Sequence, residues 1–370
     1  MFHPFEKSFT LFFEGAQRRT RLEGMEPISG TLVGKSLDHK LDRLLADPGC
    51  RDFILADAKD ADMAFGLAAP GHRAGGSFRS LEEFRDTIRE IVRQGLVDVM
   101  LMSASTSERL ASDEGLFASS AVTPAVRMND TTDIWLAAGS ATYPQQPALP
   151  FATTTIAHAQ VGRLDASGPS APRVDLGLFS ITLNGDAVLD REMLTAYRDF
   201  RHQAERAGFR HFLEVFFPNA MPPERAPLGI ARFVADHVVR LLAGVPRAGR
   251  PLFLKIPYLG PEITEQLASY DRSLIVGILG GSAGTTHDAF ALVADSKRHG
   301  ARVALFGRKI NAAEHQLEFL RFLRAVADDV LPAHEGVRAY HAELARLGIR
   351  PNRPLDEDLQ LTHTAAAYGA

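Results

Sequence analysis

The sequence predicts a (β/α)8 TIM barrel, from the number of strand-like runs, their alternation with helical segments and the length they span. Short aliphatic runs alternate with amphipathic segments from about residue 50 onward. Strands are expected at 52–58, 96–102, 123–129, 175–183, 211–217, 251–257, 273–279 and 302–307. Eight such units match the size and order of this barrel. An open doubly wound sheet is the competing fold, although no G-x-G-x-x-G follows the first strand.

The segments between the strands carry helix start and stop signals. The run "SLEEFRDTIREIVRQG" begins with a capping box of Ser80 and Glu83 and closes on Gly95, and the segment 190–208 closes on a glycine. Further helices are expected within 224–244, 260–270, 286–300 and 313–330.

The chain divides into three parts on this interpretation. Residues 1–49 form an N-terminal extension packed on the barrel, 50–332 form the barrel, and 333–370 form a C-terminal helix and tail. Residues 130–174 hold more than a simple connection needs, so we expect an insertion after the third strand.

Composition limits the function classes. The chain is 45% apolar and 23% charged, which is typical of a soluble globular protein, and its formal charge of -4 gives no basic surface for nucleic acid. The single cysteine, Cys50, excludes an intramolecular disulfide and a cysteine-based zinc site. No signal-peptide pattern or membrane-length apolar run is present. We expect a cytoplasmic homo-oligomer that binds a small molecule, with no metal, cofactor, nucleic-acid or membrane partner.

One lysine stands out from the other basic residues. Only seven of the 41 basic residues are lysines, and Lys255 alone lies within an apolar strand, "PLFLKIP". Near the C-terminal end of a barrel strand it would point toward the face where barrel enzymes carry out their chemistry. Burial disfavours the ammonium form, which leaves an amine able to form a Schiff base. The alternative is a lysine whose amine reaches water or pairs with a carboxylate.

Two carboxylates in other strands strengthen the catalytic interpretation. Glu214 in "FLEVFFPN" lies in the preceding strand and could meet Lys255 as a proton carrier. Asp57 ends the first strand and could hold a substrate hydroxyl or the imine. Taken singly, Glu214 could instead be an ion-pair partner and Asp57 a turn cap.

The loops after the last two strands are candidates for phosphate binding. Barrel enzymes commonly bind phosphate there, where glycines let backbone N–H groups approach and an arginine adds a bidentate donor. The first loop offers Gly280, Gly281 and Ser282, and the second offers Gly307 and Arg308.

The chain resembles the class I, Schiff-base aldolases of the DeoC/LacD type, which include fructose-bisphosphate, tagatose-bisphosphate and sulfofructose-phosphate aldolases. The resemblance covers about residues 50–330 and is strongest in "FLKIP", "GILGGSAGTTHDAF" and "GARVALFGRKI". It implies that Lys255 forms the imine, that Asp57 contacts the substrate hydroxyl or the imine, and that Gly281, Ser282, Gly307 and Arg308 hold a phosphate.

The sequence departs from part of the family at the fifth strand. Fructose-type members place a tyrosine before a proline there as proton carrier, whereas this chain has Phe217 before Pro218. Glu214 matches the tagatose-type pattern instead, and Tyr258 is the next candidate because it is the hydroxyl nearest the lysine in sequence. At the end of the third strand, Arg127 and Asn129 stand where some relatives keep a lysine. Arg127 would bind a second anionic group or form a surface salt bridge.

These residues favour a metal-independent class I aldolase that cleaves a ketose phosphate and releases dihydroxyacetone phosphate. One alternative is a phosphosugar isomerase or epimerase, which would use carboxylates and need no lysine. The other is a catalytically silent barrel that binds a phosphosugar.

Overall fold

Eight parallel strands form a closed barrel in the computed structural model, which describes residues 34–73, 76–137, 145–164, 173–281 and 284–362. Neighbouring strands follow the order β8-β7-β6-β3-β2-β1-β10-β9. A parallel bridge between Ile256 and Ile278 joins the last strand to the first and closes the sheet. The predicted (β/α)8 barrel is therefore confirmed, and the open sheet was the wrong alternative. The barrel strands are β1 (Ile54–Lys59), β2 (Val99–Met102), β3 (Thr123–Arg127), β6 (Leu176–Thr182), β7 (Arg210–Phe216), β8 (Leu254–Lys255), β9 (Gly277–Leu279) and β10 (Val303–Phe306).

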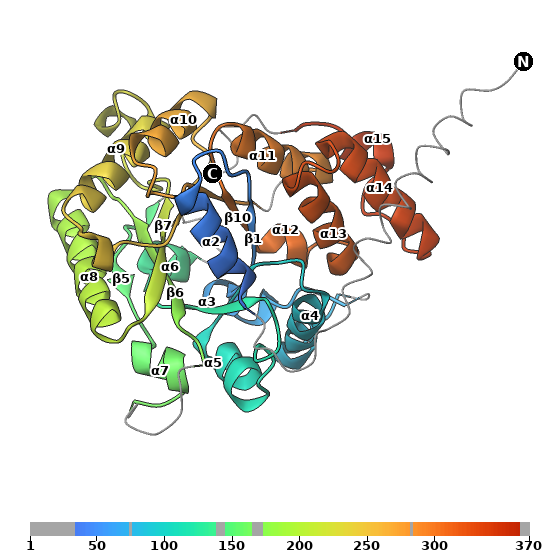
Figure 1. Ribbon diagram of the computed structural model, residues 1–370, viewed down its shortest axis with the longest axis horizontal. Coiled ribbons are helices and arrows are strands. Elements are labelled where there is room, and N and C mark those ends of the chain that lie inside the picture. Colours follow the sequence, from blue (N-terminus) through green and yellow to red (C-terminus); the bar gives the residue numbers. More distant parts are fainter. Residues whose placement is uncertain (1–33, 74–75, 138–144, 165–172, 282–283, 363–370) are drawn as a thin grey trace, which may run out of the picture. The chain divides into compact units, whose positions relative to one another are not determined.

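Helices surround the strands, as Figure 1 shows for α8, α9, α10, α11, α13 and α4. The capping box of Ser80 and Glu83 forms as predicted, and its helix ends at the left-handed Gly95. The segment predicted from residue 190 begins three residues earlier, because the Asp186 carboxylate caps it by accepting from the N–H groups of Val188 and Leu189. The helices of the βα units are α4 (Leu81–Gln94), α5 (Ala104–Ser107), α8 (Ala187–Arg206), α9 (Ile230–Ala243), α10 (Pro261–Tyr270), α11 (Thr286–Arg298), α12 (Arg308–Asn311) and α13 (Gln316–Ala327).

Strand β8 is shorter than the expected 251–257. Regular pairing covers only Leu254 and Lys255, and one further bridge forms at Ile256. Pro251 and Pro257 flank this stretch, and a proline has no N–H to donate to a neighbouring strand.

Alternate residues of each strand face two separate apolar clusters. One cluster fills the barrel interior and includes Ala56, Leu178, Phe212 and Phe253. The other lies between the strands and the helices and includes Leu55, which alternates with Ala56. Membership of a cluster therefore shows which side of the barrel wall a strand residue faces.

Helix α2 (Ser36–Ala46) precedes the first strand and contributes to the interior cluster. Its Leu37 and Leu41 pack with the inward-facing strand residues, and Figure 1 shows α2, in blue, lying across the barrel strands. The part of the predicted N-terminal extension before residue 34 lies outside the described residues.

The expected insertion contains elements of its own. Strands β4 (Asp130–Thr131) and β5 (Pro150–Phe151) pair antiparallel, and helices α6 (Thr132–Ala137) and α7 (Ile156–Val161) follow them in turn. At the other end of the chain, helix α14 (Ala333–Arg346) packs on α11 and α13, and α15 (Leu355–Asp358) packs on α14. The smaller helical turns are α3 (Ala61–Phe65), η1 (Gly66–Ala68), η2 (Glu108–Asp113), η4 (Pro223–Arg225) and η5 (Arg247–Gly249).

Within the described residues, no helix combines the length and the apolar character needed to cross a membrane.

Gly277 lies in β9 where the barrel closes against β8, and its neighbours leave no room for a side chain. A Cβ atom at this position would lie 2.2 Å from the backbone oxygen of Leu254 and 2.8 Å from Val303 Cβ. We expect Gly277→Ala to lower the free energy of unfolding by about 1–3 kcal/mol, because the strands must move apart to admit the methyl group. Gly244→Ala is the control, since a Cβ there meets nothing within 4 Å. The measurement is the urea unfolding midpoint of both variants. Equal midpoints would contradict tight closure.

Candidate active site

Three polar side chains form one row across neighbouring strands inside the barrel. Ser180 of β6 is the register partner of Glu214 in β7, and Glu214 is the partner of Lys255 in β8. Each lies two residues after a member of the interior cluster in its strand (Leu178, Phe212 and Phe253), so all three face inward. The row lies toward the C-terminal ends of the strands, where barrel enzymes place their chemistry.

Lys255 and Glu214 form an enclosed ion pair. The distance from Lys255 Nζ to Glu214 Oε1 is 2.6 Å, and the two residues are only 7% and 1% exposed. Coulomb attraction is strong at this separation away from water, and it offsets the cost of burying both charges. The structure therefore brings together the two residues that the sequence proposed as nucleophile and proton carrier.

The second oxygen of the same carboxylate is also held. Ser180 Oγ donates to Glu214 Oε2 at 2.6 Å, and Ser180 is fully buried. The side-chain amide of Asn129 accepts from the Ser180 N–H at 2.7 Å and donates to the Ser180 carbonyl at 2.8 Å. Asn129 thus holds the backbone of β6 with both ends of its amide.

Arg127 is enclosed by carboxylates at the end of β3. Its Nη1 lies 3.1 Å from Asp60 Oδ2, and its Nε lies 3.1 Å from Asp130 Oδ1. Burial lowers the pKa of this guanidinium, but the charges of Asp60, Glu214 and Asp130 outweigh burial and leave the pKa raised. Arg127 is only 5% exposed and also donates to the Asn129 carbonyl, so it supports the wall of the site.

The structure does not bring Asp57 to this row. Asp57 alternates with Ala56 and Ala58 of the interior cluster, so its side chain faces the helices. It lies 3.2 Å from Lys59 Nζ, and Lys59 donates to Gln316 of α13. Burial raises the pKa of Asp57 to about 6, and Lys59 opposes the shift. This pair joins β1 to the helical layer, and Asp60 is the β1-end carboxylate that reaches the interior side.

The two predicted phosphate loops follow the adjacent strands β9 and β10. A Cβ at Gly280 would meet the Phe306 ring at 2.1 Å, and one at Gly307 would meet the Ala58 carbonyl oxygen at 2.6 Å. Both glycines are therefore needed for close packing where the loops begin. Arg308 is exposed, and its guanidinium carbon lies 5.9 Å from the Phe65 ring centroid. Gly281 precedes Ser282, which lies outside the described residues.

The first amides of helix α11 are occupied by the chain's own carboxylates. The Thr285 N–H donates to Asp288, and the Thr286 N–H donates to Asp358 from the C-terminal segment. A phosphate at this end would therefore depend on the loop amides and on Arg308.

Tyr258 faces away from the lysine. It belongs to the outer apolar cluster, and its hydroxyl donates to Asp295 of α11 at 2.7 Å. Phe217 also packs against the outer cluster. Of the two aromatic residues considered from the sequence, neither reaches the row, and Glu214 is the acidic side chain that contacts Lys255.

Sequence reasoning missed Ser180, Asp60 and Asp130. Ser180 had a detectable signal, because it is a polar residue in the apolar run "GLFSITL". It lies two residues after Leu178 and therefore on the same inward face of the strand. Asp60 and Asp130 lie just beyond strand ends, where a carboxylate is equally typical of a turn. In the described part of the chain, no group of three or more His, Cys, Asp or Glu side chains is placed to bind a metal ion.

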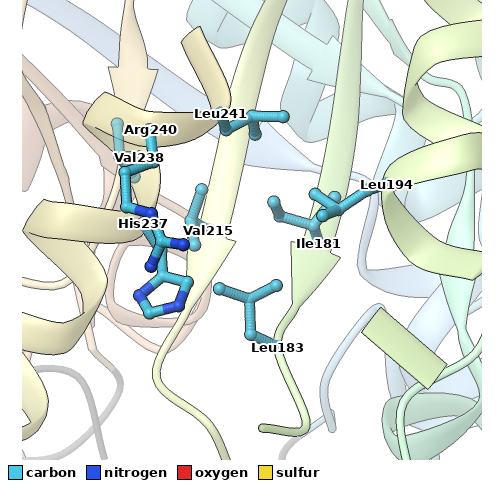
Figure 2. Close-up of a pocket in the computed structure, with 8 residues that line it drawn as sticks. All are labelled: Ile181, Leu183, Leu194, Val215, His237, Val238, Arg240 and Leu241. Carbon is cyan, nitrogen blue, oxygen red and sulfur yellow. The ribbon is translucent and has the colours of Figure 1, made fainter. Parts of the chain in front are cut away.

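A cavity lined by apolar side chains together with His237 and Arg240 lies behind the row, on the helix side of the same strands. Figure 2 shows it between Ile181 of β6, Val215 of β7 and residues of α9, with Leu194 of α8 at its edge. Its volume is about 280 Å³. Ile181 and Val215 alternate with Ser180 and Glu214, so the barrel wall separates the cavity from the polar row.

Several solved structures share this fold. A fructose-bisphosphate aldolase from Slackia heliotrinireducens is 16% identical, with 87% of this chain and 95% of that chain covered and a TM-score of 0.58. An archaeal fructose-1,6-bisphosphate aldolase, whose catalytic Lys is covalently bound to the carbinolamine intermediate of the substrate, is 16% identical, with 78% and 99% covered and a TM-score of 0.53. Cgl0159 from Corynebacterium glutamicum is 14% identical, with 80% and 94% covered and a TM-score of 0.51.

No protein-family model matches the sequence, and no curated protein matches it either. The likeness is one of fold: this chain shares the (β/α)8 barrel of these fructose-bisphosphate aldolases.

Proposed function

We propose that this protein is a class I aldolase that cleaves a ketose phosphate through a Schiff base on Lys255 and releases dihydroxyacetone phosphate. The observation that carries the proposal is the enclosed pair of Lys255 and Glu214, 2.6 Å apart inside the barrel. The structural neighbours support it, because one of them holds a substrate intermediate on its catalytic lysine. The imine serves as electron sink, so the mechanism needs no metal.

The first step forms the imine. Glu214 Oε1 accepts a proton from the Lys255 ammonium, and the freed amine attacks the ketone carbon of the substrate. Glu214 returns the proton to the carbinolamine oxygen, water leaves, and a protonated imine and the Glu214 carboxylate remain. The hydrogen-bond distance between the two side chains allows this transfer without rearrangement.

The second step breaks the carbon–carbon bond. Glu214 accepts the proton of the C4 hydroxyl, the C3–C4 electron pair moves toward the imine, and an aldehyde leaves. The enamine then takes the proton back from Glu214 at C3. Water hydrolyses the regenerated imine and releases dihydroxyacetone phosphate. One carboxylate thus removes and returns one proton in each turnover.

The phosphate group would bind beside the lysine. Strand β9 contacts β8 through the Ile256–Ile278 bridge and β10 follows β9, so the two loops begin on the side of the barrel that carries Lys255. We assign the phosphate to Gly280, Gly281, Gly307 and Arg308, together with Ser282, which lies outside the described residues, and a phosphate on C1 of the substrate suits that side. Such anchoring orients the reacting bond over the amine.

Arg127 and Asn129 take supporting roles in this proposal. The two carboxylates beside Arg127 already balance its charge, and the Asn129 amide is bonded to β6 at both ends. We therefore assign neither residue to a phosphate.

The first prediction concerns the imine. We expect Lys255→Met and Lys255→Arg to abolish cleavage with the fold retained, because a thioether cannot form an imine and an arginine stays protonated. Borohydride reduction with dihydroxyacetone phosphate should add mass to the Lys255 peptide of the wild type only. Lys40→Met, at the opposite end of the barrel beside Asp98, is the control and should still be trapped. Turnover within about tenfold of wild type in either Lys255 variant would refute the mechanism.

The second prediction concerns proton transfer. We expect Glu214→Gln to remain trappable by borohydride, while cleavage slows by about 10²- to 10⁴-fold, because the amide keeps the shape but cannot carry the proton. Trapping and cleavage assays on the same preparation measure both effects. Loss of both activities would assign Glu214 to imine formation or folding, and retention of both would place the proton carrier elsewhere.

The third prediction concerns the phosphate loops. A hydrogen bond to a charged group is worth about 1.5–3 kcal/mol, so Arg308→Ala should raise KM for a phosphorylated ketose about tenfold or more, with a smaller effect on kcat. Arg338→Ala, at an exposed position on α14, is the matched control. Steady-state kinetics and competition by inorganic phosphate provide the measurement. An unchanged KM without phosphate competition would show that the loops bind something else.

A further inference from the structure

We infer that Ser180 is a positioning residue that keeps the Glu214 carboxylate aimed at the substrate after Lys255 has become bound to it. This inference rests on the proposed Schiff-base function and adds a residue that neither the strand pattern nor the family resemblance assigned. The observation that carries it is the separate use of the two carboxylate oxygens, Oε1 by Lys255 and Oε2 by Ser180, each at 2.6 Å.

The two contacts do not persist equally through the reaction. When Lys255 Nζ forms the imine, it becomes bonded to substrate carbon and keeps a single N–H, so its hold on Oε1 weakens. Ser180 Oγ takes no part in bond formation and can continue to donate to Oε2. Oε1 is then the oxygen that exchanges protons with the substrate, and Oε2 is the oxygen by which the side chain is held.

The backbone of Ser180 is held by Asn129, which lies just after the neighbouring strand β3. Backbone pairing of β3 with β6 ends at Arg127 and Leu178, because the chain turns away into β4 at Asp130. Beyond that point the Asn129 amide replaces the missing backbone partner and bonds the N–H and the carbonyl of Ser180. Arg127 Nε in turn donates to the Asn129 carbonyl at 2.9 Å. The hydroxyl of Ser180 is thus held by strand geometry on both sides.

The proton step balances on these atoms. In the enamine, Glu214 carries the proton on Oε1. The enamine double bond supplies the electron pair for the new C3–H bond, the nitrogen regains the imine, and Glu214 returns to the carboxylate. Ser180 donates to Oε2 throughout and takes no part in the transfer.

Loss of that hydrogen bond leaves the Glu214 carboxylate without the contact that fixes its orientation. The other charged groups that act on Glu214 are Lys255, Arg127 and Asp130, and Ser180→Ala leaves all three in place. We therefore expect the variant to keep the charges around the site and to lose the alignment of Oε1 with C3.

The experiment uses dihydroxyacetone phosphate alone, so it does not depend on the identity of the aldehyde. Enzyme and dihydroxyacetone phosphate are incubated in deuterated water at neutral pH, and the rate of deuterium incorporation at C3 is followed. Borohydride trapping on the same samples reports imine formation. The variants are Ser180→Ala, Ser180→Cys, which keeps the size with a weaker donor, and the control Ser296→Ala. Ser296 is fully buried in α11 and donates to the Val293 carbonyl, far along the chain from the row.

We expect the Ser180→Ala substitution to slow deuterium exchange at C3 and to leave borohydride trapping of the imine unchanged. Ser180→Ala should be trapped like wild type but exchange about 10- to 100-fold more slowly. Ser180→Cys should fall between them, and Ser296→Ala should match wild type. A folded Ser180→Ala that exchanges at the wild-type rate, or that is no longer trapped, would overturn the inference. Failure of the wild type itself to be trapped would instead overturn the proposed function.

Discussion

The burial of one ammonium and one carboxylate together is the constraint on which the site depends. An isolated charge in this position would cost several kcal/mol, and each of Lys255 and Glu214 lowers the cost of burying the other. The partnership also makes each group useful. The carboxylate can accept the ammonium proton over a hydrogen-bond distance, and the resulting amine is free to attack a carbonyl.

Barrel geometry supplies that partnership. Ser180, Glu214 and Lys255 come from three consecutive strands of one register, so their inward-facing side chains lie in a single row. The register of β8 depends on closure against β9, where Gly277 leaves no space for a side chain beside Leu254. Close packing on the far side of the lysine thus helps to hold it opposite its carboxylate. The glycines at the ends of β9 and β10 continue this close packing toward the proposed phosphate loops.

The first strand shows why one part of the site could not be predicted. Asp57 lies within a run that is buried on its two faces, "FILADAK", and Asp60 directly follows it, so no alternation of polar and apolar residues reveals which side chain points inward. Asp57 proved to face the helices with Lys59, and Asp60 faces Arg127. A shift of one residue exchanges the two faces, and only the packed barrel determines which face is inside.

The sequence by itself determined the eight strands, the capped helix after β1 and the two charges placed within apolar strands, because each is a local pattern read along one segment. The tertiary structure decided which groups meet: Glu214 with Lys255 and Ser180, Asn129 with the backbone of β6, and Tyr258 with Asp295 instead of the lysine. Those contacts join residues far apart in the chain. They follow from strand register and from the closure of the sheet, which no single segment encodes.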